Sequence, residues 1–119
     1  MSNVDRWIKQ AQKRLRLEDY DIEYDPLCPM EEDDHLAEIG YNMEHPSATI
    51  ALKPGVKVTE ELILHEVAHL LFARMRPFVV NTINAYVTDS TARQVLKDTV
   101  FAEEEQIVNR LVRALNKEV

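Results

Sequence analysis

The amino-acid sequence predicts an α+β fold in which a small, antiparallel-type sheet of about three strands is combined with helices. Three observations support this prediction: apolar residues recur at helical spacing near both ends of the chain, short strand-like stretches lie between residues 20 and 52, and a long apolar helical stretch follows them. The chain has 119 residues, no internal repeat and no low-complexity linker, which favours a single domain over residues 1–119.

The first predicted element is an amphipathic helix over residues 3–17, with apolar residues on one side and Lys and Arg on the other. Three stretches then have the composition of strands: residues 20–24 (YDIEY), 36–43 (LAEIGYNM) and 47–52 (SATIAL). The dipeptide His45-Pro46 separates the last two, which favours a β-hairpin.

The strongest predicted helix covers residues 59–76. Thr59 is a suitable N-cap, acidic residues follow it in the first turn, and Pro77 is expected to end the helix. Its faces are apolar almost all round, as in a helix buried at the centre of a domain. Its middle nevertheless contains the ionisable segment HEVAH, and ionisable groups are costly to bury without a partner.

The last predicted element is an amphipathic C-terminal helix whose apolar stripe runs from Phe101 to Leu115. The pattern of residues 78–98 is less decisive, although Ser90 is a suitable N-cap for a helix that begins near Thr91.

Charge and cysteine content exclude several classes of protein. The chain has 14 Lys and Arg against 21 Asp and Glu, a net charge of −7, which argues against binding to nucleic acid or to anionic membranes. Its one cysteine, Cys28, cannot form an internal disulfide, and the sequence has neither a signal-peptide pattern nor an apolar run of membrane-spanning length. We therefore expect a soluble, cytoplasmic protein.

His65-Glu66-Val67-Ala68-His69 is an HExxH motif. Helix residues four apart differ by about 40° in azimuth and about 6 Å in height, so that both imidazoles can reach one ion. Imidazole nitrogen suits Zn²⁺, and Glu66 on the adjoining face can take a proton from a zinc-bound water without ligating the metal. The motif predicts one zinc ion per chain. The alternative is a pair of core histidines bonded to backbone carbonyl groups.

A catalytic zinc site usually has three protein ligands, and the motif supplies two. No histidine follows His69, which excludes the longer HExxHxxGxxH pattern. Cys28, His35 and His45 lie upstream and are the weaker alternatives for the third ligand.

Three consecutive glutamates at the expected start of the C-terminal helix are better candidates. Relative to Val108, Glu103 points away at about −140°, Glu104 lies nearest the apolar stripe at about −40°, and Glu105 lies on its flank at about +60°. Acidic residues also suit the start of a helix for electrostatic reasons. Spacing alone does not decide between Glu104 and Glu105.

HEVAH, followed about 35 residues later by a helical glutamate, resembles the motifs of gluzincin metallopeptidases. The small size is similar to that of minimal gluzincins (minigluzincins) and of ImmA/IrrE-type and phage-associated metallopeptidase domains. In those families the third ligand begins a segment Glu-x-x-small-Asn/Asp followed by apolar residues, a form that fits residues 105–109 and does not fit a segment beginning at Glu104. The resemblance therefore implies His65, His69 and Glu105 as ligands, Glu66 as general base and Asn109 as a partner of a ligand histidine.

The resemblance implies a zinc-dependent peptidase, or a latent form of one, that acts on peptides or proteins. We expect the substrate to lie extended along strand 47–52 as an edge strand, where Ala48 leaves room for it. The Tyr or His that larger gluzincins use to stabilise the oxyanion has no clear match, and Tyr86 and Tyr41 are the candidates.

The alternative is a metal-stabilised regulatory or interaction domain with little or no hydrolytic activity. In that hypothesis the exposed sheet edge and the C-terminal helix mediate self-association, for example as a homodimer.

Overall fold

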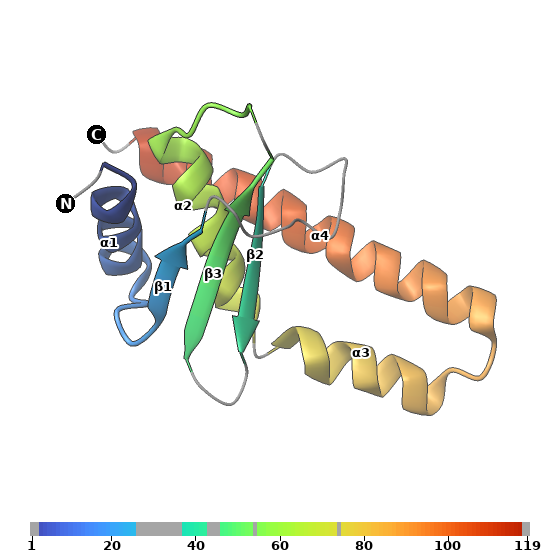
Figure 1. Cartoon of the computed structure of the whole chain (residues 1–119). Helices are drawn as coiled ribbons and strands as arrows, with labels where there is room; N and C mark the ends of the chain where they lie inside the picture. The colour runs from blue at the N-terminus through green and yellow to red at the C-terminus, as the bar shows by residue number, and fades with distance from the viewer. Residues whose placement is uncertain (1–2, 26–36, 43–45, 54, 74, 118–119) are drawn as a thin grey trace. The chain divides into compact units, whose positions relative to one another are not determined.

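The structure is a computed structural model that describes residues 3–25, 37–42, 46–53, 55–73 and 75–117. Its fold is α+β and mostly helical, which confirms the predicted class (Figure 1). Backbone packing divides the chain into two compact units, Met1–Leu71 and Phe72–Val119. The expectation of one domain over residues 1–119 stays a prediction. The elements are α1 (Asn3–Leu15), β1 (Asp21–Tyr24), β2 (Ala37–Asn42), β3 (Ser47–Leu52), α2 (Glu60–Ala68), the 3₁₀ helix η1 (His69–Phe72), α3 (Met75–Tyr86) and α4 (Ser90–Lys117).

The sheet of the first unit is mixed, with the strand order β1-β3-β2. β2 and β3 form the predicted antiparallel hairpin, in which Asn42 pairs with Ser47. β1 instead runs parallel to β3, and the Asp21 N–H donates to the Pro46 carbonyl at the start of that strand. The predicted antiparallel-type sheet is therefore wrong at β1. The reason is the strand order: β3 lies between β1 and β2, and it runs parallel to β1 and antiparallel to β2.

The same strand order makes β3 the central strand, so the prediction that residues 47–52 form an edge strand is wrong. Both edges of β3 are paired, to β1 and to β2. Its side chains agree with a central position, because Ala48, Ile50, Ala51 and Leu52 are all buried.

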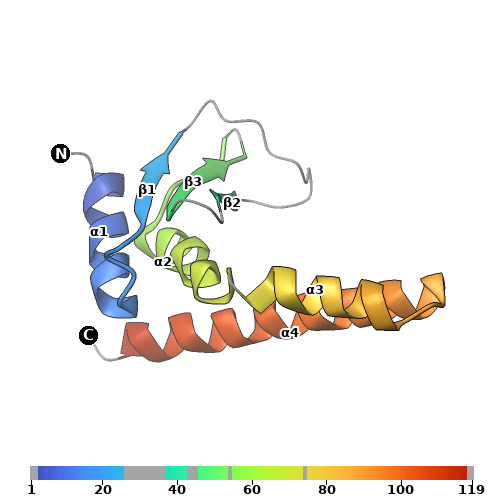
Figure 2. The same cartoon turned by 90° about the horizontal axis from the view of Figure 1, so that it is seen from below.

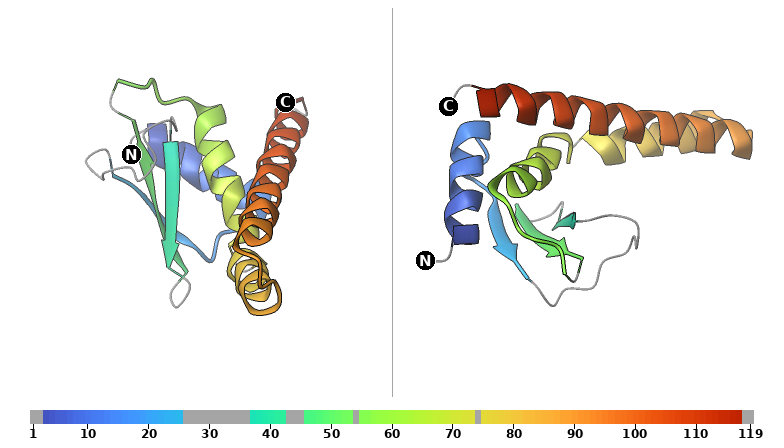
Figure 3. Two further views of the ribbon diagram at one scale, coloured as in Figure 1. Left: turned by 90° about the vertical axis from the view of Figure 1, so that its right-hand side faces the viewer. Right: turned by 90° about the horizontal axis from the view of Figure 1, so that it is seen from above.

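α1 and α2 lie on the same side of the sheet and contact each other (Figures 2 and 3). The core of the first unit lies between these helices and the sheet, and Ile50, Ile63 and Val67 at its centre are wholly buried. The apolar stripe of α1 contributes Ile8, Ala11 and Leu15, as its helical spacing predicted.

The end of α1 is a Schellman motif. The Leu17 N–H donates to the Gln12 carbonyl at 2.8 Å, and the Arg16 N–H donates to the Lys13 carbonyl at 3.4 Å. Arg16 takes the left-handed conformation at the position after the C-cap, with φ 59°. The buried Gln12 side chain donates to the Leu17 and Tyr20 carbonyls, which fixes the chain as it turns toward β1.

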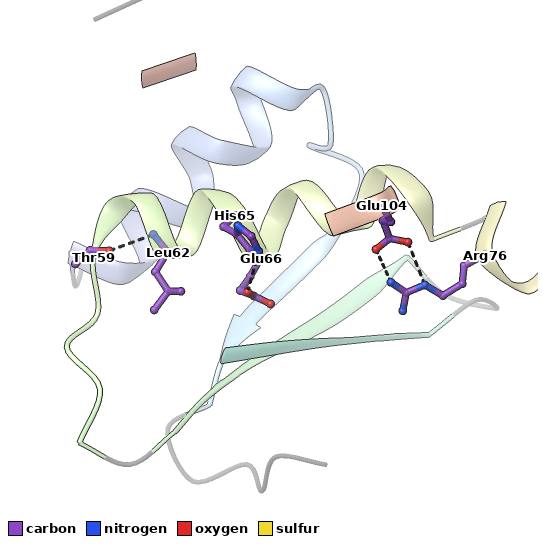
Figure 4. A network of polar contacts seen from close by, with 6 residues as sticks. All are labelled: Thr59, Leu62, His65, Glu66, Arg76 and Glu104. Atoms are coloured by element: carbon purple, nitrogen blue, oxygen red, sulfur yellow. Dashed lines mark hydrogen bonds and ion pairs between the residues drawn. The ribbon is translucent and has the colours of Figure 1, made fainter. Parts of the chain in front are cut away.

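α2 begins as predicted, because the Thr59 side chain accepts a hydrogen bond from the Leu62 N–H at 3.1 Å (Figure 4). It ends earlier than predicted: the α-helix stops at Ala68, and a 3₁₀ helix follows. Pro77 does not end this helix. It lies in the first turn of α3, where the N–H that proline lacks would have had no partner within the helix.

The second unit contains α3 and α4, which run antiparallel as a helical hairpin (Figure 1). α4 is a single helix of 28 residues, and it is capped by Asp89, whose side chain accepts from the Ala92 N–H at 3.1 Å. The predicted cap, Ser90, is the first residue of the helix. The three glutamates at 103–105 lie near the middle of α4, so the helix dipole does not account for them. None of the described helices, α4 included, is both long and apolar enough to cross a lipid bilayer.

Candidate metal centre

The two histidines of the HExxH motif lie side by side in the first unit. His65 is in the last turn of α2 and His69 is its C-cap residue, with φ −59° and ψ −26°. Because His69 keeps a right-handed helical backbone, the four-residue spacing still brings both imidazoles together, although η1 begins at His69. The ring centroids are 5.1 Å apart and the rings are inclined at 70°. The predicted pairing of these side chains is therefore present.

Buried apolar residues surround the histidine pair along the chain, among them Leu64, Val67 and Leu70. The two imidazoles themselves are only half-buried. This combination places nitrogen donors at the boundary between the core and solvent, where an ion or substrate can approach while the apolar side restricts water.

Glu66 lies next to the histidine pair and is only 6% exposed. Its Oε2 atom is 3.9 Å from Nε2 of His65 (Figure 4). That separation exceeds a direct hydrogen bond, and one water oxygen between the two groups can contact both. The carboxylate therefore lies close to the histidine pair, and the role of Glu66 as general base stays a prediction.

In the second unit, the Arg76 guanidinium holds the Glu104 carboxylate in a two-point ion pair. Nε of Arg76 donates to Oε1 at 3.2 Å, and Nη2 donates to Oε2 (Figure 4). Glu104 is 5% exposed, and the guanidinium also lies 5.0 Å from the centre of the Phe101 ring. Both oxygens of Glu104 are thus bonded to an arginine, which argues against Glu104 as a metal ligand.

Glu105, the neighbouring residue, is exposed on α4. Asn109 lies one turn further along and is half-buried, and its backbone carbonyl accepts from the Arg113 side chain at 3.4 Å. The exposure of Glu105 leaves its carboxylate accessible to an ion, in contrast with the buried carboxylate of Glu104.

His65, His69 and Glu105 form a set of donors that could hold a metal ion. Two imidazole nitrogens and one carboxylate oxygen are typical donors for first-row transition metals, zinc among them.

The other predicted site residues have different positions. Ala48 is 5% exposed in the central strand, between Ile22 of β1 and Tyr41 of β2, so no substrate strand can pair with it. Tyr86 is 84% exposed at the end of α3. The Tyr41 side chain and residues Cys28, His35 and His45 lie outside the part of the chain that the structure describes.

Sequence reasoning missed Arg76 as a residue that affects the choice of ligand. The sequence placed Arg76 at the end of the HExxH helix, and 28 residues separate it from Glu104. No local periodicity links two positions so far apart.

Comparison with protein-family models, with curated proteins and with solved structures found no match. The resemblance to gluzincins therefore depends on the HExxH motif and the glutamate segment of α4.

Proposed function

We propose that the protein is a zinc-dependent peptidase whose metal is held by His65, His69 and Glu105. The main support is the arrangement around the motif: two imidazoles side by side, with the buried Glu66 carboxylate 3.9 Å from one of them. A pair of histidines that served only packing would not require a buried carboxylate next to it.

Each residue has one task in this proposal. The imidazoles and Glu105 supply two neutral donors and one anionic donor, which leaves a fourth position for water or substrate. Zinc bound there would act as a Lewis acid toward a peptide carbonyl and would acidify its water. Glu66 takes the proton from that water on its carboxylate and passes it to the leaving amine. Asn109, one turn beyond Glu105, is proposed to orient a ligand.

We prefer Glu105 to Glu104 as the third ligand because Glu104 is already paired with Arg76. If Glu104 were to bind a metal, it would have to leave the Arg76 guanidinium, which would lose two hydrogen bonds. Glu105 is exposed on α4, and it begins the segment that resembles the gluzincin pattern.

The substrate would add to the sheet at β2 rather than β3. Main-chain addition requires an unpaired strand edge, and within the described sheet β2 is an outer strand. β2 also contacts α2, the helix that bears His65 and Glu66. An extended peptide along β2 would therefore run close to the motif.

Metal analysis and peptide cleavage test the proposal together. Wild type is expected to bind one zinc per chain and to cleave a library of unstructured peptides. Glu105→Gln is expected to lose most of its zinc affinity, whereas the matched variant Glu103→Gln, which alters another exposed glutamate of α4, is expected to keep it. Equal zinc content in the two variants would contradict Glu105 as a ligand. Zinc without cleavage in wild type would instead favour a metal-stabilised regulatory domain.

A further inference from the structure

The part of the helical hairpin formed by α3 and the first half of α4 has no buried core. Of residues 75–101, all of which the structure describes, none is buried. Large apolar side chains are exposed there: Met75 is 54% exposed, Phe78 71% and Tyr86 84%, and Val95 and Leu96 on α4 are also exposed. Clustered exposed aromatic residues of this kind indicate a binding surface.

The exposed residues of α3 share one face. With 100° per residue, Met75, Phe78 and Tyr86 fall within an arc of about 80°. Thr82 lies in the same arc, and its hydroxyl already donates to the Phe78 carbonyl at 2.7 Å, so it requires no further polar partner. Val80 and Ile83 lie outside this arc and are half-buried. We call the arc of Met75, Phe78, Thr82 and Tyr86 the α3 face.

Two helices alone cannot enclose a core, because each has only the other to pack against. The smallest common helical arrangement with a central core brings four helices together. A second hairpin of the same kind supplies the missing pair, and a two-fold axis lets the α3 face pack against itself.

Charge also favours a second copy of this chain. Residues 75–101 contain three basic side chains (Arg76, Arg93, Lys97) and two acidic ones (Asp89, Asp98), a balance of +1 in a chain of net charge −7. The remaining residues therefore carry −8. Two copies that approach through the hairpin avoid most of the repulsion between their acidic surfaces. α3 itself has a single charged residue, Arg76, and it is paired with Glu104.

The exposed area is sufficient for a weak dimer. An aromatic side chain can bury about 150–250 Å², so the exposed fractions of Phe78 and Tyr86 amount to about 230–390 Å² per copy. Met75, Leu96 and their neighbours raise the total to about 800–1,200 Å² over two copies, which is below the roughly 1,200–2,000 Å² of stable interfaces and in the range of weak, transient ones. A dimer of this size dissociates on dilution.

We propose that two copies of this chain associate through the α3 face and the first half of α4 to form a four-helix bundle. This inference concerns the hairpin alone and does not depend on metal binding or catalysis.

Sedimentation velocity over a concentration series tests it with the full chain. Wild type is expected to change from monomer to dimer as concentration rises. Phe78→Glu places a charge at the α3 face and is expected to weaken the dimer at least tenfold. The control Asn84→Glu adds the same charge on the far side of α3, about 160° from the middle of that face, and is expected to dimerise like wild type. Circular dichroism shows whether each variant keeps its helices.

A cross-linking variant tests the same surface without weakening it. Thr82→Cys in a Cys28→Ser background is expected to form a disulfide-linked dimer under mild oxidation, whereas Cys28→Ser alone stays unlinked. A wild type that is monomeric at every concentration overturns the proposal, as does equal dimerisation of Phe78→Glu and wild type. Binding of monomeric wild type to phosphatidylcholine vesicles through Phe78 also overturns it, because the face would then serve a lipid surface.

Discussion

The guanidinium of Arg76 donates to both carboxylate oxygens of Glu104, a residue 28 positions later. This pair joins α3 to α4 and fixes the rotation of α4 about its axis relative to α3. The ion pair also engages Glu104, the glutamate whose position around the helix is nearest the apolar stripe of α4. The neighbouring Glu105 is the glutamate that we propose as metal ligand.

Removal of Arg76 is expected to destabilise the second unit. Arg76→Met leaves the buried Glu104 carboxylate without its main partner, and we expect a loss of about 2 kcal/mol, below the usual 3–5 kcal/mol because the arginine side chain is 36% exposed. Urea denaturation measures the loss. The double variant Arg76→Met/Glu104→Leu should recover part of it. Additive losses in the double variant would show that the two residues do not interact.

Glu66→Gln is expected to separate metal binding from catalysis. Gln keeps the shape of Glu66 and cannot accept the proton, so zinc content should stay at one per chain while cleavage falls by about 10²–10⁴-fold. The matched variant Glu61→Gln, at an exposed position of α2, should behave like wild type. Cleavage at the wild-type rate in Glu66→Gln would rule out its role as general base.

Zinc is expected to stabilise the folded chain. A ligand that binds only the folded state at 100 times its dissociation constant adds about 2.7 kcal/mol, so the thermal midpoint should rise with zinc and fall on chelation. His65→Ala should abolish the response. A midpoint that is insensitive to zinc in wild type would contradict the metal site in either proposed function.

Arg16→Gly is expected to stabilise the protein by about 0.5–1 kcal/mol. Arg16 has φ 59°, a conformation that glycine adopts at little cost and that arginine does not. Lys13→Gly, three residues earlier inside α1, should instead cost about 1 kcal/mol. Chemical denaturation distinguishes the two, and a destabilised Arg16→Gly would mean that the arginine side chain contributes more than its backbone strain costs.

Thr59→Ala is expected to cost about 1 kcal/mol, because the Leu62 N–H loses its capping oxygen. Thr59→Asp keeps an acceptor at the same place and should be close to neutral. Equal losses in both variants, measured by thermal denaturation, would show that the threonine methyl group rather than the cap is important.

Local features of the fold could be predicted from the sequence, whereas long-range pairings could not. The Thr59 cap and the juxtaposition of His65 and His69 each involve residues three or four positions apart, where helix geometry alone determines proximity. The end of α2 was mispredicted because a proline near the boundary of two helices suits the first turn of the second as well as the end of the first.

The sequence by itself determined α1, the three strands, the start of α2 and the position of the histidine pair, since periodicity and capping act over a few residues; it did not predict α3. Only the tertiary structure decided that β3 lies between β1 and β2 and that Arg76 pairs with Glu104 and not with its neighbours. Strand order and ion pairs of this kind depend on contacts between distant parts of the chain, and many such arrangements satisfy the same local pattern of apolar and polar residues.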